Sequence, residues 1–219
     1  MAEVRQRIEA ARAQSANRQA VTLVAVTKTH GPEAVVAAHN AGVLDVGENK
    51  VQEAESKMDL VRVPVRWHLI GHLQRNKAKS AIRFDLVHSV DSERLAQAVN
   101  DAAQVVNRVQ DMLVQVNVSG EGSKSGIGVG DVASFAGMLH QCSHLRVTGV
   151  MTMAPFDAPE SVLRSVFSGA RAVQEQLNSE GHPATVLSMG MSDDFEVAVQ
   201  EGATLVRLGT VLFGHRASS

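Results

Sequence analysis

The chain has 219 residues, of which 44% are hydrophobic, and a formal net charge of -2 at pH 7. This length and composition suit one globular domain with a sizeable core, so we expect a single domain over residues 1–219. The nearly balanced charge gives no reason to expect nucleic acid or a membrane surface as a partner.

The N-terminal residues 1–20 are charged and rich in Ala and Gln, with no long apolar stretch. They predict neither a signal peptide nor a membrane span. Within them, Val4, Ile8 and Ala11 share one face of an amphipathic helix expected over Glu3–Asn17. The single cysteine, Cys142, excludes an internal disulfide framework and suits a reducing cytosol, so we expect a cytoplasmic protein.

Short apolar runs and helical segments then alternate along the chain. The expected strands are Val21–Thr27, Val43–Val46, Val65–Ile70, Leu86–Val90, Met112–Val118, Arg146–Met151, Thr185–Ser188 and Thr204–Leu208. The expected helices between them are Pro32–Ala41, Lys50–Leu60, Asn76–Ile82, Ser92–Val106, Val129–Gln141, Pro159–Asn178 and Asp193–Gln200.

Strands separated by helices imply βαβ units and a parallel sheet. Eight such strands in this length predict a single (β/α)8 barrel with one extra N-terminal helix. The alternative is a doubly wound open sheet, which more often has about five to seven strands and a glycine fingerprint after the first. No such fingerprint follows Thr27.

Polar residues at the carboxyl ends of these strands would share one barrel rim, where barrel enzymes place their active sites. Lys28 ends the first run. A lysine there in a low-dielectric surrounding would be a nucleophilic amine, suited to a Schiff base with a carbonyl. The alternative is a lysine whose stem covers apolar surface while its ammonium reaches water.

Two later strand ends have the composition of a phosphate cradle. Ser188–Asp193 leads into a helix, and Arg207–Thr210 closes the last strand with another glycine and hydroxyl. Barrels often bind phosphate with the loops after strands seven and eight. A simple turn requirement would explain either glycine alone, but the pair at these two positions favours the cradle.

With these residues in place, the sequence resembles the pyridoxal phosphate homeostasis proteins, the family of YggS in bacteria and of proline synthase co-transcribed protein in animals. The matching stretches are Ala25–Thr29, Val46–Glu53, Trp67–Gly71, His88–Ser92, Gln115–Val118, Ser123–Gly126, Gly149–Met153, Leu187–Asp194, Val206–Thr210 and Phe213–Gly214. They span nearly the whole chain in order. Lys50 departs from the family, which often has Tyr or Arg there.

The resemblance implies an alanine racemase-like barrel with pyridoxal phosphate as its cofactor. It implies that Lys28 forms a Schiff base with the cofactor and that Asn49 lies at or beside the ring. The expected phosphate contacts are Ser188, Gly190, Gly209 and Thr210. Arg207 would face the pyridine nitrogen; the alternative for this residue is an ion pair at the rim. A guanidinium cannot accept a proton, so it favours an unprotonated pyridine, which is a poorer electron sink.

Related racemases need a second acid or base, normally a tyrosine from another domain, and this chain contains no Tyr. His68 or His72 could stand in for it, although both are expected as strand-end or loop residues, and Cys142 is expected in the core. We therefore expect a non-catalytic protein that buffers pyridoxal phosphate and delivers it to apo-enzymes. We also expect a monomer. The alternative is a weak amino-acid racemase that uses the same cofactor.

Three further motifs have simpler explanations. His68 and His72 have a zinc-like spacing but lack the glutamate and the helix of such sites, so no metal is expected. Ser119–Gly126 resembles a phosphate-binding loop but lacks the glycine before Lys124, which is expected as a solvated rim lysine or a transient second attachment point. Gln74–Lys79 is a modest basic run on a solvated helix face.

Overall fold

The structure is a computed structural model and describes residues 1–120 and 125–214. Its strands are β1 Thr22–Val26, β2 Asp45–Glu48, β3 Arg66–Leu69, β4 Leu86–Val90, β5 Gln110–Asn117, β6 Ile127–Gly128, β7 Leu145–Met151, β8 Val186–Ser188 and β9 Leu205–Leu208. Its α-helices are α1 Ala2–Gln14, α2 Pro32–Asn40, α3 Val51–Leu60, α4 Ala78–Ala81, α5 Glu93–Val105, α6 Val132–Leu139, α7 Glu160–Ser179, α8 Phe195–Gln200 and α9 Thr210–Phe213. The 3₁₀ turns η1 Arg75–Lys77 and η2 Val129–Asp131 precede α4 and α6.

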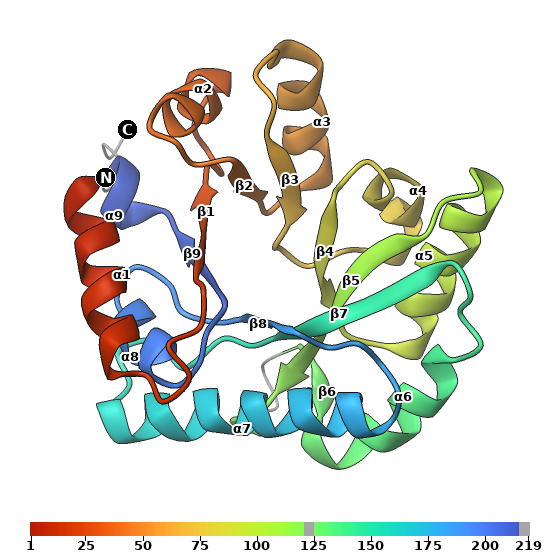
Figure 1. Cartoon of the computed structure of the whole chain (residues 1–219). Coiled ribbons are helices and arrows are strands. Elements are labelled where there is room, and N and C mark those ends of the chain that lie inside the picture. Colours follow the sequence, from red (N-terminus) through yellow and green to blue (C-terminus); the bar gives the residue numbers. More distant parts are fainter. Residues whose placement is uncertain (121–124, 215–219) are drawn as a thin grey trace.

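Eight parallel strands close into a barrel, as the sequence predicted (Figure 1). The order around the barrel is β1-β2-β3-β4-β5-β7-β8-β9, and β9 pairs back onto β1. The register places Val24 of β1 between Asp45 of β2 and Arg207 of β9. The short β6 adds two residues beside β5 and does not take part in the ring.

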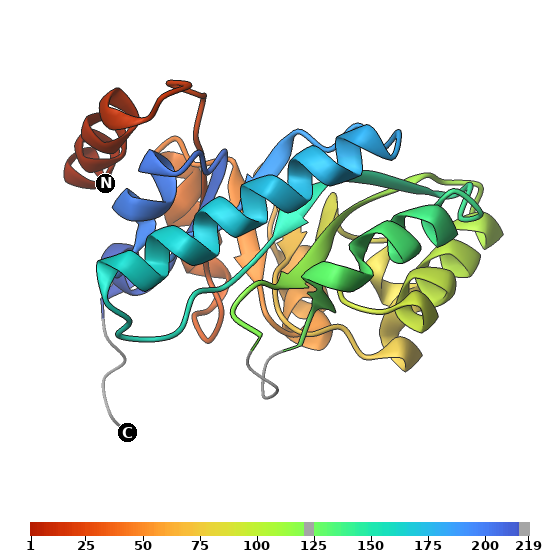
Figure 2. The same cartoon turned by 90° about the horizontal axis from the view of Figure 1, so that it is seen from below.

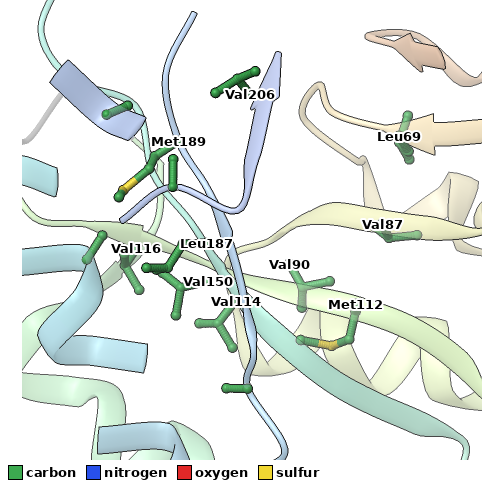
Figure 3. Packing of buried hydrophobic residues seen from close by; sticks show 14 of the residues in the cluster. Leu69, Val87, Val90, Met112, Val114, Val116, Val150, Leu187, Met189 and Val206 are labelled. Carbon is green, nitrogen blue, oxygen red and sulfur yellow. The ribbon is translucent and has the colours of Figure 1, made fainter. Parts of the chain in front are cut away.

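Alternate strand residues face the barrel interior or the surrounding helices. The interior holds a small apolar cluster of Val24, Leu86, Leu113, Met151 and Leu205. The larger core lies between strands and helices, and Figure 3 shows its valines and leucines from neighbouring strands such as β5, β7 and β8. Most of the hydrophobic burial therefore lies outside the ring, and part of the interior is left for polar side chains.

The extra N-terminal helix α1 packs against α8 (Figure 1). Arg7 of α1 forms an ion pair with Glu196, and its guanidinium lies 4.7 Å from the ring centroid of Phe195. The 20-residue α7 runs along the barrel against β7 and β8 (Figure 2). The helix α7 thus covers β8, which carries one of the predicted phosphate loops.

Element boundaries differ from the prediction mainly at helix ends. The first helix stops at Gln14, because the Ser15 hydroxyl donates to Gln19 Oε1 and Arg18 adopts a positive φ of 45°. Ser92 is the N-cap of α5 as expected, yet its hydroxyl bonds Asp91 and makes no cap hydrogen bond. The short α9 after the last strand was not predicted.

Candidate functional site at the barrel mouth

The predicted site residues lie on four neighbouring strands. Lys28 follows β1 and Asn49 follows β2, and these two strands pair in parallel. On the other side of β1 lies β9, which holds Arg207, and β8 ends beside it at Ser188. Because parallel strands in a closed barrel end at the same face, the structure brings these strand ends to one mouth.

Lys28 is exposed, so the expectation of a low-dielectric surrounding for its amine is wrong. The backbone on both sides of it is nevertheless held. Lys57 Nζ donates to the Thr27 carbonyl at 2.8 Å, and the Thr29 N–H donates to Glu53 Oε1 at 2.5 Å. Thr29 has a φ of 67°, a left-handed conformation that β-branched residues rarely adopt. The chain is thus fixed around Lys28 while the side chain stays exposed.

A buried carboxylate completes this arrangement, which we call the backbone clamp (Glu48, Glu53 and Lys57). Glu48 is fully buried, and its Oε1 accepts from Lys57 Nζ and from the Thr27 hydroxyl, both at 2.6 Å. Its Oε2 has no hydrogen-bond partner among the described residues. Burial raises the pKa of Glu48, and the Lys57 ammonium opposes that rise. Removing either charge of the Glu48–Lys57 pair would destabilise the fold, because the other charge would stay buried without its partner.

Asn49 is half-buried beside the clamp. Its backbone packs against Gly71, where an added Cβ would lie 2.3 Å from the Asn49 carbonyl oxygen. Only glycine fits this close approach, which places Asn49 at the mouth. Close packing therefore explains why the Trp67–Gly71 motif ends in glycine.

Arg207 is a buried cation that has no carboxylate within ion-pair distance in the described chain. Its Nη1 donates to Ser188 Oγ at 2.6 Å and its Nη2 to the Thr152 carbonyl at 2.9 Å. Burial lowers the pKa of Arg207 to about 10, and the Asp194 charge partly opposes this. A guanidinium carries five N–H donors, so two acceptors leave it with donor capacity for a ligand. The rim ion pair considered as the alternative is not what the structure shows.

Ser188 lies deeper than the prediction placed it. It is 1% exposed, and its Oγ contacts both Arg207 and His88 Nδ1, the latter at 2.9 Å. Its hydroxyl is thus engaged on both sides inside the barrel, and its contacts support Arg207. The phosphate contact expected for Ser188 stays a prediction.

The loop after β8 offers a different hydroxyl, which the sequence reasoning missed. Ser192 Oγ accepts from the Val211 N–H at 3.2 Å, and this contact ties the loop to the chain after β9. Gly190 in the same loop has a φ of 92°, and an added Cβ would lie 2.6 Å from the Ala198 side chain. The signal for Ser192 was present, since it is the second hydroxyl of Ser188–Ser192 and precedes a helix.

Gly209 and Thr210 lie at the junction of β9 and α9, beside that loop. Gly209 is half-buried, and an added Cβ there would contact the Val26 side chain at 3.4 Å. Thr210 is exposed. The two predicted phosphate loops therefore meet at one place, next to the end of β1.

The two histidines and the cysteine considered in the sequence do not join this group of residues. His68 is buried with both ring nitrogens engaged, by Asp45 and His88, whereas His72 is exposed beside Asp91. The two histidines thus do not converge on a common point. Cys142 is a core residue as expected, and burial raises the pKa of its thiol.

The remaining expectations concern Lys124, a metal site and a membrane span. Lys124 and much of Ser119–Gly126 lie outside the described residues. Among the residues that are described, no group of three His, Cys, Asp or Glu side chains is placed to hold a metal ion. Within the same ranges, no helix combines the length and hydrophobicity needed to cross a membrane.

Comparison with known proteins places this barrel in a class. The model of the alanine racemase N-terminal domain matches residues 1–217. An alanine racemase from Streptomyces lavendulae shares the fold with a TM-score of 0.74 at 20% identity, covering 98% of this chain and 57% of that one. The fold and the strand-end site thus define an alanine racemase-like barrel.

Nearer relatives narrow the assignment. Pyridoxal phosphate homeostasis proteins from Pseudomonas aeruginosa and Escherichia coli are 42% and 36% identical, each over 99% of this chain and 94% and 95% of their own. PipY of Synechococcus elongatus, solved with PLP bound, has a TM-score of 0.85 at 36% identity, covering 95% of this chain and 99% of its own. This chain belongs to the pyridoxal phosphate homeostasis protein family.

Proposed function

We propose that this protein binds pyridoxal phosphate at the barrel mouth, with Lys28 as the covalent attachment point. The observation that carries the proposal is Arg207, a buried cation with spare donors whose acceptors within the described part of the chain are neutral. Such a group fits a neutral nitrogen acceptor, which the pyridine ring provides. The solved PLP complex of PipY supports the same ligand.

When bound, pyridoxal phosphate supplies an aldehyde that condenses with an amine with loss of water. The exposed Lys28 amine is free to meet it, because the backbone clamp holds only the flanking residues. We assign the phosphate to Gly190, Gly209 and Thr210, with Ser192 added. Asn49 lies beside the ring, and Ser188 acts through Arg207.

We further propose that the protein stores the aldehyde and hands it to apo-enzymes without turning over amino acids. The relatives are named as homeostasis proteins. The chain has no Tyr, and both ring nitrogens of His68 are engaged inside the barrel, which leaves that side chain unavailable as a second base. A cytoplasmic monomer remains our expectation.

Absorption and chirality measurements together test this function. Adding pyridoxal phosphate to the full chain is expected to give a visible absorption band that survives dialysis. The Lys28→Ala variant is expected to lack that band, while Lys79→Ala, which removes an exposed lysine on α4, keeps it. Alanine and serine are expected to keep their chirality. A wild-type protein without the band would contradict binding, and racemisation above the Lys28→Ala background would favour the weak racemase.

A further inference from the structure

A continuous row of polar side chains leads from Arg207 into the barrel. Ser188 Oγ contacts His88 Nδ1 at 2.9 Å, His88 Nε2 contacts His68 Nδ1 at 2.9 Å, and His68 Nε2 contacts Asp45 Oδ1 at 2.9 Å. We call these four residues the interior relay. All four are buried. A polar row of this length in a barrel interior is costly unless each member is satisfied.

The relay crosses the barrel from one side to the other. His88 is on β4 and Ser188 on β8, and these strands are not neighbours in the ring. Their contact therefore passes through the interior. At its far end, Asp45 stands at the start of β2, and both its oxygens accept from Arg66 at 2.7 and 2.6 Å. The relay thus connects the mouth to the amino-terminal end of the strands.

The two ends dictate the direction of every hydrogen bond between them. Arg207 only donates, and a carboxylate only accepts. His68 Nε2–H then donates to Asp45, His88 Nε2–H donates to His68 Nδ1, and the Ser188 hydroxyl donates to His88 Nδ1. Ser188 Oγ is left to accept from Arg207. These tautomers follow from the hydrogen-bond network and satisfy every member.

The opposite direction leaves a proton without an acceptor. If His68 carried a second proton, His88 would have to donate through Nδ1 to Ser188. Ser188 would then receive two donors, and no other described residue accepts a hydrogen bond from its hydroxyl. Burial lowers the pKa of His88 well below its usual range, so the His88 ring is neutral in either direction and the hydrogen-bond partners alone decide between them.

We propose that the interior relay is a positioning device for Arg207: the Asp45 carboxylate fixes the tautomers of His68 and His88 and so makes Ser188 an acceptor for the guanidinium. An anion at the far end thereby orients the cation at the mouth without forming an ion pair with it. Arg207 keeps its charge and its spare donors for a ligand. The effect on cofactor binding rests on the proposed function, whereas the tautomers can be measured without any ligand.

The first experiment records long-range ¹H–¹⁵N spectra of the ligand-free full chain, which has nine histidines. The signals of His68 and His88 are assigned by their loss in single His→Gln variants. Both rings are expected to be neutral and protonated at Nε2, and Asp45→Ala is expected to give mixed tautomers at His88. A wild-type His88 protonated at Nδ1, or no change in Asp45→Ala, would overturn the relay.

The second experiment compares two aspartates at the amino-terminal ends of strands. Asp111 on β5 also receives a bidentate Arg, at 2.6 and 2.8 Å from Arg146, but has no hydrogen bond to any histidine that the structure describes. Asp45→Ala is expected to weaken pyridoxal phosphate binding about 3- to 10-fold, as expected when one neutral hydrogen bond is weakened. Asp111→Ala is expected to leave it unchanged.

Equal losses in both variants would contradict the positioning role of the relay. If wild-type protein fails to bind pyridoxal phosphate, the proposed function falls, while the tautomer result still decides the relay. If Asp45→Ala does not fold, the wild-type tautomers alone decide it. Failure of the proposed function and failure of the relay are therefore distinguishable.

Discussion

The two cations of the mouth are held in opposite ways. Lys28 is exposed, and charged groups of the backbone clamp fix the chain around it. Arg207 is buried, and neutral groups hold its side chain directly. Near Lys28, the ion pair of the backbone clamp contacts the chain beside Lys28. Near Arg207, three relay side chains separate the guanidinium from the Asp45 carboxylate.

This difference matches what each group would have to do. An amine that forms and releases a covalent bond needs a fixed origin and a mobile side chain, which the backbone clamp provides. A guanidinium that recognises a ring nitrogen needs a fixed side chain and unused donors, which the interior relay provides. The same barrel mouth therefore uses charged groups to fix the backbone around Lys28 and neutral groups to fix the charged side chain of Arg207.

Removing Lys57 should have the largest effect on stability. The Lys57→Met variant leaves the Glu48 carboxylate buried without its cation and frees the Thr27 carbonyl. We expect a loss of about 3 to 5 kcal/mol in the free energy of unfolding, measured by urea denaturation. Adding Glu48→Gln should restore most of it, because the uncompensated charge is gone. A loss in Lys57→Met that the second substitution does not restore would contradict an ionic clamp.

Replacing Arg207 should weaken the binding of pyridoxal phosphate. In Arg207→Lys the single ammonium cannot serve Ser188, the Thr152 carbonyl and a ligand in the same geometry. We expect pyridoxal phosphate to bind on the order of 100-fold more weakly, because a hydrogen bond from a charged group is lost. Equilibrium dialysis measures this. Unchanged affinity would show that the spare donors of Arg207 do not contact the cofactor.

Acid should weaken the interior relay at its far end, where Asp45 accepts from His68 and Arg66. Burial alone would raise the pKa of Asp45, but its bonds to His68 and Arg66 outweigh burial and lower the pKa from 3.8 to about 2. The unfolded chain therefore binds a proton at higher pH than the folded chain does, and stability falls as pH drops through this range.

The lowered pKa of Asp45 corresponds to about 2 kcal/mol of stability present above roughly pH 4 and lost towards roughly pH 2. Urea denaturation at several pH values measures it for wild type and for Asp45→Asn, which cannot titrate. We expect the stability difference between the two proteins to shrink by that amount across the range. A difference that stays constant with pH would contradict the contribution of Asp45.

The fold could be predicted from sequence because its signals are local. Buried parallel strands appear as short Val-rich runs, and the glycines after helices, such as Gly42 and Gly202, have the positive φ their positions require. Helix ends were harder, because they depend on contacts such as Ser15 with Gln19. The short α9 has too few residues to show a helical period.

The strands that carry the site residues could be predicted from the sequence, but the depth at which each side chain is buried could not. Lys28, Asn49 and Arg207 could be placed at the mouth because each follows or lies in a recognisable strand. Whether a strand-end side chain faces outward or into the ring depends on a one-residue register, and this put Ser188 in the interior. The interior relay joins residues from four strands, and no single-sequence pattern records such contacts.

Borohydride reduction followed by peptide mass spectrometry identifies the lysine to which pyridoxal phosphate is attached. The full chain is incubated with pyridoxal phosphate, reduced and digested, and every lysine is examined for a pyridoxyl adduct. We expect one dominant adduct on Lys28, absent in Lys28→Ala and retained in Lys79→Ala. A dominant adduct on another lysine, or no adduct at all, would contradict it.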